Sequence, residues 1–254
     1  MLESTFLHIP RISATTEQKL WRAGATDWHR FLRMDGELPL THSRKDTITS
    51  SVKESMRALH DKDGAYFARR LPVQYHWRAY RPFREKACFL DIETTGLTKG
   101  CDIVTVVGIA THDEVRTFVH GRNMDDMVPY LRQFDVVVTF NGRCFDIPFL
   151  QRAIPGMPEN LLHVDLRFVL RSLGYSGGLK LIERQMGIAR DDEIADVDGF
   201  EAVRLWYRYR RGDSGALGTL LAYNIADVEN LRVLMDIALA RLLQSVPFPD
   251  RSAA

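Results

Sequence analysis

A short apolar segment that carries two acids one residue apart constrains this chain more than any other feature. Residues 89–97 have the sequence Phe-Leu-Asp-Ile-Glu-Thr-Thr-Gly-Leu. In a strand, alternate side chains point to the same face, so Asp91 and Glu93 share one face. Leu90 and Ile92 then lie on the other face, towards a core. The segment therefore predicts a strand with one acidic face and one buried face.

Two carboxylates on one face repel each other and lose hydration, so such a pair normally needs a cation between them. Mg²⁺ and Mn²⁺ are the divalent ions that carboxylate oxygens prefer. The pair Asp91 and Glu93 is therefore a candidate metal site. The alternative is a strand end whose acids reach solvent, and other parts of the chain must decide between the two.

The composition is that of a soluble globular protein. The chain has 254 residues, of which 45% are hydrophobic and 26% charged, which suits one large domain or one and a half. The longest apolar runs, 103–110 and 136–140, are too short to span a bilayer, and the first residues lack a signal peptide's basic and apolar regions. We therefore expect a cytoplasmic protein without membrane association.

Cysteine usage and charge distribution add two expectations. The three cysteines form no C-x-x-C pair, which predicts reduced thiols and argues against zinc or iron–sulfur ligation. Residues 1–85 carry 15 Lys and Arg against 10 Asp and Glu, whereas residues 86–254 carry 19 against 23. A basic part beside an acidic, metal-binding part suits an enzyme that acts on a polyanion, although the asymmetry is modest.

Residues 1–84 predict a helical, basic N-terminal module with a connecting segment. Helices are expected at 16–23, 27–34 and 53–62. The beginning is faintly similar to a helix-hairpin-helix DNA-binding element, but Arg11 and Ser13 occupy the places of its glycines. A plain helical packing module is therefore the favoured interpretation.

The connecting segment 64–85 interleaves aromatic residues with arginines. Such a mixture can stack on bases and hold phosphates. It can equally pack the segment onto the next domain while the guanidinium heads stay in water. The packing role is the favoured interpretation, and both roles can hold for different residues.

Residues 85–246 predict an α/β domain with a mixed sheet flanked by helices, followed by a tail at 247–254. Three strands in succession, then alternation of strands and helices, then a helical remainder indicate this class. The strands are expected at 88–92, 103–111, 115–120 and 135–140, and the helices at 124–133, 148–153, 166–173, 179–186, 200–211 and 216–243.

A third acid, Asp146, follows the predicted strand 135–140 at the start of a helix. Binding groups of α/β folds gather at such carboxyl ends of strands. The alternative is an ordinary helix N-cap, worth about 1 kcal/mol and without chemistry. Asp165 also precedes a helix, and we interpret it first as a cap and second as a group that supports the site.

The fourth acid, Asp227, lies one helical turn after Tyr223 on the same face of a predicted helix. An apolar stripe on that helix would turn it against the sheet, and both side chains lie near this stripe rather than on the polar side. The arrangement suggests a site. The alternative is a surface Asp with a half-buried Tyr.

Taken together and in this order, the three motifs resemble a known family. D-x-E at the end of the first strand, N-x-x-x-F-D at a helix start and Y-x-x-x-D on a late helix resemble the DEDD 3′→5′ exonucleases of the ribonuclease-H-like fold. The chain more closely resembles the YprB-like ribonuclease-H-like proteins, through segments 90–97, 205–209 and 223–227. The resemblance covers about residues 65–244. Tyr223 and Ala222 fit the tyrosine branch, written DEDDy, and not the histidine branch.

The resemblance implies a nuclease that hydrolyses phosphodiester bonds, most simply a 3′→5′ exonuclease on single-stranded DNA or RNA. Two Mg²⁺ or Mn²⁺ ions would activate water and neutralise the leaving group. The implied ligands are Asp91, Glu93, Asp146 and Asp227, with Tyr223 orienting the attacking water. The implied contacts to the terminal nucleotide are Thr94, Leu97, Asn141 and Phe145.

Three alternatives stay open at this point. The same fold supports endonucleases, a retired site would leave a nucleic-acid-binding protein, and a phosphatase would act on small nucleotides. The expected partner is nucleic acid, and no obligate protein partner can be inferred. A basic, aromatic helix at 200–211 could guide a strand, although such a helix more often buries its aromatic side chains.

Overall fold

A mixed sheet forms the centre of the molecule. The structure is a computed structural model that describes residues 1–34, 38, 40–98, 100–191, 194, 197–246 and 248. Within these residues, five strands pair in the order β3-β2-β1-β4-β5. Neighbours β1, β2 and β3 are antiparallel, and β1, β4 and β5 are parallel. The strands are β1 (Ala87–Thr94), β2 (Val104–Ala110), β3 (Val115–Val119), β4 (Val136–Thr139) and β5 (Leu162–Asp165).

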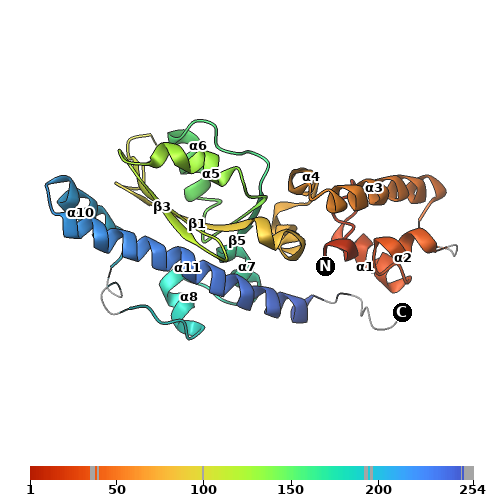
Figure 1. Cartoon of the computed structure of the whole chain (residues 1–254). Helices are drawn as coiled ribbons and strands as arrows, with labels where there is room; N and C mark the ends of the chain where they lie inside the picture. The colour runs from red at the N-terminus through yellow and green to blue at the C-terminus, as the bar shows by residue number, and fades with distance from the viewer. Residues whose placement is uncertain are drawn as a thin grey trace.

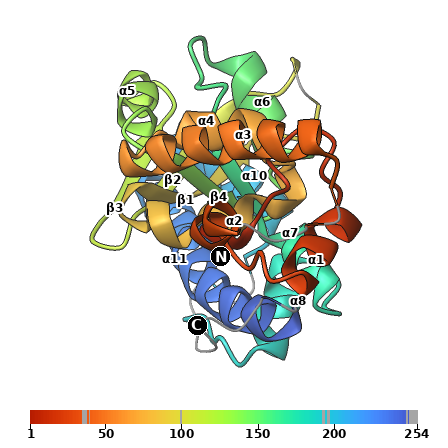
Figure 2. The same cartoon turned by 90° about the vertical axis from the view of Figure 1, so that its right-hand side faces the viewer.

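Helices cover both faces of the sheet, as Figures 1 and 2 show. One face carries α5 (Met127–Leu131) and α6 (Asp146–Ala153), and the other carries the long α11 (Ser214–Ser245). The remaining helices of this half are α7 (Leu166–Ser172), α8 (Leu179–Gln185) and α10 (Gly199–Arg210), with α10 packed against α11. The predicted class, a mixed sheet flanked by helices, is confirmed.

The two faces of β1 separate as the alternation predicts. Leu90 and Ile92 belong to a hydrophobic cluster with Phe149 and the helices α5 and α6. Phe89, one position away, belongs to the cluster that contains Val228 of α11. Asp91 and Glu93 alternate with Leu90 and Ile92, so both acids face α11. The expected strand 88–92 in fact continues to Thr94, which places both acids inside it.

Two predictions for this half need correction: one strand was not predicted, and one predicted helix is divided. No strand was predicted at 162–165, yet β5 forms there and pairs in parallel with β4. A four-residue strand is too short to show a hydrophobic period. The helix expected at 124–133 is divided into a 3-10 turn, η4 (Met124–Asp126), and the short helix α5.

The N-terminal part is helical, as predicted, and lies beside the end of the sheet (Figure 1). Its helices are α1 (Ala14–Arg22), α2 (Trp28–Arg33), α3 (His42–His60) and α4 (Gly64–Arg70), with the 3-10 helices η1 (Leu2–Ser4), η2 (Val73–Ala79) and η3 (Arg81–Lys86). The third helix, expected at 53–62, begins eleven residues earlier at His42 because its polar first turns carry no apolar period. Ser13 caps α1: its hydroxyl oxygen accepts from the Thr16 N–H at 3.2 Å.

The aromatic residues of segment 64–85 pack into the core, in agreement with the favoured interpretation. Phe67, Trp77, Tyr80 and Phe83 are all buried. One part of the expectation is wrong, because the guanidinium of Arg78 does not lie in water. Only 5% of its side chain is exposed, and its Nη1 lies 2.6 Å from Glu17 Oε1 of α1. The buried acid attracts this guanidinium into the protein.

One hydrophobic cluster runs from the N-terminal helices to α11. It includes Leu20 of α1 and Leu242 of α11, and Phe248 packs against it. The division into a module at 1–84 and a domain at 85–246 stays a prediction. Of the predicted tail 247–254, only Phe248 lies among the described residues. None of the described helices has the length and hydropathy needed to cross a bilayer.

Candidate active site

All the residues predicted for the site line one cavity of about 720 Å³ at the carboxyl end of β1. Strand β1 supplies two acids, the start of α6 a third, and α11 the fourth together with the tyrosine. The predicted residues in this lining are Asp91, Glu93, Thr94, Leu97, Asn141, Phe145, Asp146, Tyr223 and Asp227. Residues from three distant parts of the sequence thus meet at one place.

Three of the four acids form a compact cluster. Asp91, Glu93 and Asp227 each offer a carboxylate oxygen, and these atoms lie within 4.8 Å of one another. Glu93 and Asp227 are buried, with 7% and 4% of their surface exposed. This set of hard oxygen donors fits Mg²⁺ or Mn²⁺ in its chemistry.

Asp146, at the start of α6, is the fourth acid in the lining of the cavity. It is the first residue of α6, and Phe145 holds the N-cap position without a side-chain capping bond. The N-cap alternative for Asp146 is therefore wrong. The residue is 3% exposed and lines the same cavity as the other acids.

The electrostatics of the cluster are unfavourable without a cation. Burial, followed by the charges of Asp227 and Asp146, raises the pKa of both Asp91 and Glu93 well above the usual range. Burial also raises the pKa of Asp146 to about 7. For Asp227, burial raises the pKa to about 6, although Arg190 opposes the shift. The charged forms of these acids therefore need a positive partner.

Arg190 supplies part of that positive charge, and it was not predicted for the site. Its side chain is 6% exposed, and its Nη2 lies 2.5 Å from Asp227 Oδ1. Its Nε and Nη2 donate to both oxygens of Glu183 in α8, at 2.6 and 2.7 Å. Asn230 of α11 also donates to Glu183, at 3.0 Å. The signal that the sequence offers for this cluster is the acid Glu183, which lies beside the apolar residue Ile182 in the predicted helix 179–186.

Asn224 is a second residue that sequence reasoning left without a role. It follows Tyr223 on α11, and its Nδ2 donates to Asp91 Oδ2 at 3.0 Å. A Cβ atom on Gly108 of β2, which pairs with Asp91 across the sheet, would lie 2.2 Å from Asn224 Oδ1. The glycine therefore allows α11 to approach the sheet closely enough for this hydrogen bond.

The Tyr223 phenol lies beside cations as well as acids. Burial, followed by the charges of Asp227, Glu93 and Asp91, raises the pKa of Tyr223. Lys180 Nζ and Arg190 Cζ lie 5.3 and 5.6 Å from the centre of its ring. The hydroxyl group therefore stays protonated at neutral pH and can donate a hydrogen bond, but it is not a general base.

Asp165 organises the loop that carries Asn141. Its carboxylate accepts from the backbone N–H groups of Asn141, Arg143 and Arg167 at 2.8, 2.9 and 3.0 Å. Asn141 has a φ of 66°, and its Oδ1 accepts from Arg167 Nη1 at 2.6 Å. Asp165 is thus both the cap of α7, as first interpreted, and a support for the loop between β4 and α6.

The remaining predicted residues differ in exposure. The Thr94 hydroxyl donates to the Gly96 carbonyl at 2.6 Å, which fixes the turn after β1. Phe145 packs on Phe149, with their ring centroids 5.5 Å apart. Leu97 is 77% exposed. Phe200 of α10, which was not predicted for the site, also lines the cavity and is 78% exposed.

Comparison with known families assigns this fold. Residues 88–239 match a family described as the RNase H superfamily. The chain belongs to the RNase H superfamily. The mixed sheet with flanking helices is accordingly an RNase H-like α/β fold. A comparison with curated proteins found no match.

Several solved structures are similar to this RNase H-like chain. The family B DNA polymerase of Pyrobaculum calidifontis gives a TM-score of 0.49 at 20% identity, over 62% of this chain and 24% of the polymerase chain. Brucella melitensis NrnC with bound Mg²⁺ gives 0.45 at 21% identity, over 64% and 76% of the two chains. The Aedes aegypti Nibbler EXO domain gives 0.46 at 14% identity, over 68% and 86%. The chain therefore spans about a quarter of the polymerase and most of the two smaller chains.

Proposed function

We propose that this protein is a metal-dependent nuclease of the DEDDy type, similar to the YprB-like proteins, that removes nucleotides from the 3′ end of single-stranded DNA or RNA. One observation carries the proposal. Four carboxylates from β1, α6 and α11 line one cavity, three of them buried and Asp91 half-buried, and a tyrosine lies one helical turn before the last of them. Buried acids gathered at one place destabilise a fold unless a cation compensates their charge. A protein that keeps such a cluster therefore uses it to bind a cation or to carry out a reaction.

Two Mg²⁺ or Mn²⁺ ions, when bound, would supply an activated water and neutralise charge on the departing oxygen. Asp91, Glu93 and Asp227 would hold them, together with Asp146. Asn224 fixes the orientation of the Asp91 carboxylate, and Arg190 fixes that of Asp227. Ligands held by neighbouring hydrogen bonds keep their geometry when the substrate enters.

Tyr223 and the apolar residues of the cavity would position the substrate. The protonated Tyr223 hydroxyl donates a hydrogen bond to the attacking water or to the scissile phosphate, without removing a proton itself. Leu97 and Phe145 offer apolar contact to the terminal base. Thr94 and Asn141 offer polar contacts to the terminal sugar and its phosphate.

A hydrolysis assay with end-labelled strands tests the proposal. Single-stranded DNA and RNA carrying a 5′ label are incubated with the protein in Mg²⁺ or Mn²⁺, and we expect stepwise shortening from the 3′ end. A circular single strand serves as the control, because its cleavage would reveal an endonuclease instead. The absence of shortening on every linear strand would refute the proposal.

Two variants separate the roles inside the site. Asp91→Asn should abolish shortening and weaken Mn²⁺ binding in calorimetry, since it removes a ligand. Tyr223→Phe should lower kcat while Mn²⁺ affinity stays the same, since the phenol is not a ligand. Weaker Mn²⁺ binding by Tyr223→Phe with unchanged turnover would contradict the role given to the tyrosine.

A further inference from the structure

Helix α10 presents a row of four side chains towards the active site. Phe200, Val203, Tyr207 and Arg210 are spaced by three, four and three residues, which places them on one face of the helix. We call this row the α10 stripe. Phe200 and Val203 line the cavity of the acids, and Tyr207 and Arg210 line the hollow beside it. The stripe therefore leads from the active site across the surface.

The hollows beside the active site adjoin one another, and we call the row that they form the path. The hollow at Tyr207 and Arg210 has a volume of about 340 Å³ and shares Thr95 with the active-site cavity. It shares Cys101, Ile103 and His120 with a third hollow of about 650 Å³. The shared lining residues place the three spaces next to one another at one end of the sheet.

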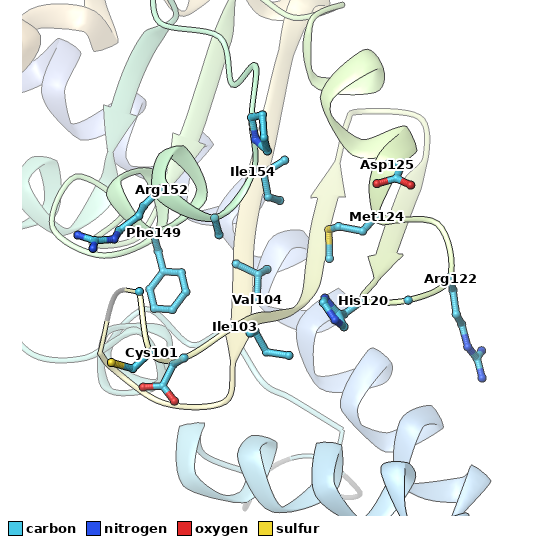
Figure 3. Close-up of a pocket in the computed structure, with 15 residues that line it drawn as sticks. Cys101, Ile103, Val104, His120, Arg122, Met124, Asp125, Phe149, Arg152 and Ile154 are labelled. Carbon is cyan, nitrogen blue, oxygen red and sulfur yellow. The ribbon is translucent and has the colours of Figure 1, made fainter.

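The third hollow, drawn in Figure 3, lies between α6 and the ends of β2 and β3. Arg152 of α6 and Arg122 after β3 stand on opposite sides of it. Both arginines are exposed. The Asp102 carboxylate in its wall already accepts from the Thr98 N–H at 2.8 Å and the Thr95 hydroxyl at 3.1 Å. Asp125 also lines this hollow, so arginine and acid face the same space.

The structure separates the basic and aromatic groups of α10 into two sets. Trp206 is buried, Arg204 pairs with Glu201 at 3.3 Å, and Arg208 pairs with Asp213 at 2.7 Å. These side chains stabilise α10 through burial and through ion pairs with neighbouring acids. Tyr207, by contrast, is 48% exposed, and together with Arg210 it faces the path.

The path has the chemistry of a site for an unpaired nucleic-acid strand. Exposed aromatic side chains stack on bases, and arginines between them hold phosphates, which is how proteins bind single strands. Bases inside a duplex have no free face for such stacking. From Phe200 to Arg210 the helix rises about 15 Å, several times the roughly 3.4 Å that one nucleotide spans in a stacked duplex strand. The stripe is thus long enough for several nucleotides beyond the terminal one.

We propose that the α10 stripe binds the single strand that extends away from the active site. Bases stack on Phe200 and Tyr207, a phosphate contacts Arg210, and the strand continues towards Arg122 and Arg152. The proposal rests on the proposed nuclease function for the placement of the strand's end at the acids. To that function the proposal adds a binding surface for the strand and a preference for substrates longer than a dinucleotide.

Binding of a fluorescein-labelled oligothymidylate of 12 nucleotides, measured by fluorescence anisotropy in EDTA, tests the surface without any hydrolysis. The double variant Tyr207→Ala/Arg210→Ala should bind at least about tenfold more weakly, since each lost stacked base alone accounts for such a factor. Arg204→Ala is the matched control, because it removes the same charge from the same helix away from the hollows. It should bind as the unchanged protein does, and thermal unfolding checks that each variant folds.

Salt dependence and substrate length give two further readouts. The slope of log K against log salt concentration should fall by about 0.7 for Arg210→Ala, the value for one phosphate contact to a single strand, and not for Arg204→Ala. Tyr207→Phe should retain the affinity that Tyr207→Ala loses. In hydrolysis, the double variant should lose at least fivefold more kcat/KM on the 12-nucleotide strand than on a dinucleotide.

Equal losses for Arg204→Ala and the double variant, or full binding by the double variant, would overturn the proposal. So would equal losses on the dinucleotide and the longer strand. If the unchanged protein hydrolyses neither substrate, the nuclease function fails, whereas the binding comparison in EDTA still decides whether the α10 stripe holds a strand.

Discussion

Two groups of buried charge in this molecule are compensated very differently. In the N-terminal helices, Glu17 is 1% exposed and accepts from the Thr5 hydroxyl, the Phe6 N–H and Arg78, at 2.7, 2.7 and 2.6 Å. The Arg78 guanidinium carbon also lies 4.9 Å from the centre of the Tyr75 ring. One negative group thus meets one positive group and several hydrogen-bond donors.

The cluster at the end of β1 has the opposite balance. Asp91, Glu93, Asp146 and Asp227 line one cavity, and the buried cation beside them, Arg190, is shared with Glu183. The pKa of each of these four cavity acids is raised, chiefly because burial disfavours the charged form, and the charges of neighbouring acids add to the shift. A compensated pair holds the fold together, whereas an uncompensated cluster needs a ligand. The balance of charge therefore distinguishes the Glu17–Arg78 pair, which has a structural role, from the four cavity acids, which have a functional one.

Breaking the compensated pair should give the largest loss of stability. Arg78→Met leaves the Glu17 charge buried without its partner, and we expect the free energy of unfolding to fall by about 3–5 kcal/mol. Urea denaturation followed by circular dichroism measures the loss. Arg22→Met, an exposed arginine of α1, is the control and should change stability by less than about 0.5 kcal/mol. A loss below about 1 kcal/mol for Arg78→Met would remove the contrast between the two clusters.

Neutralising one acid of the site should change activity and stability in opposite directions. Asp91→Asn should lower the rate of hydrolysis at least about a hundredfold. Even the substitution of residues that only support metal ligands lowers activity by up to about a hundredfold. In EDTA the same variant should raise Tm by about 2–4 °C or more, which corresponds to about 1 kcal/mol at this size. The reason is that the folded protein no longer buries a repelled charge. A lower Tm in EDTA would show that the acids are compensated after all.

The stability of the metal-free protein should fall as pH rises from about 4 to 7. A folded carboxyl group with a raised pKa keeps its proton where the unfolded chain has lost it, so the folded state binds more protons over this range. Asp146 and Asp227, with pKa values of about 7 and 6, set the upper part of the window. Thermal unfolding in EDTA across this range measures the trend. With Mn²⁺ present the trend should reverse, because the ion competes with protons for the same oxygens.

The last prediction concerns the approach of α11 to the sheet. Gly108→Ala places a Cβ 2.2 Å from Asn224 Oδ1, and we expect a loss of about 1–3 kcal/mol in urea denaturation. Gly218→Ala, in α11 itself and with open space around it, should instead stabilise the protein by about 0.5–1 kcal/mol. Equal effects of the two substitutions would mean that Gly108 does not determine the packing of Asn224.

Local periodicity was enough to predict the elements that carry the acids. The alternation around Asp91 and Glu93 gave both the strand and its faces, and the apolar stripe of residues 216–243 gave the long helix. Short or polar elements gave no such signal. Strand β5 has four residues, and the first half of α3 is almost entirely polar, with Ile48 as its one apolar residue, so β5 was missed and α3 was shortened.

The buried charge pairs could not be predicted from local patterns, because their partners are far apart in the sequence. Arg78 lies 61 residues from Glu17, and Arg190 comes from a segment without any recognisable motif. Pattern reasoning placed the arginine heads of segment 64–85 in water for the same reason. The location of a charge in the folded protein depends on which acid the tertiary structure brings to it.

Phe248 packs on two tryptophans that the ribosome synthesises long before it. Its ring centroid lies 5.5 Å from Trp21 and 6.1 Å from Trp77, and the Arg78 guanidinium carbon lies 5.0 Å from the centre of its ring. Ribosomes add about 5–20 residues per second, so Phe248 leaves the ribosome roughly 9–45 s after these tryptophans. Throughout that interval the nascent N-terminal helices present uncovered tryptophan faces, and chaperones that recognise exposed aromatic side chains have their opportunity to bind there.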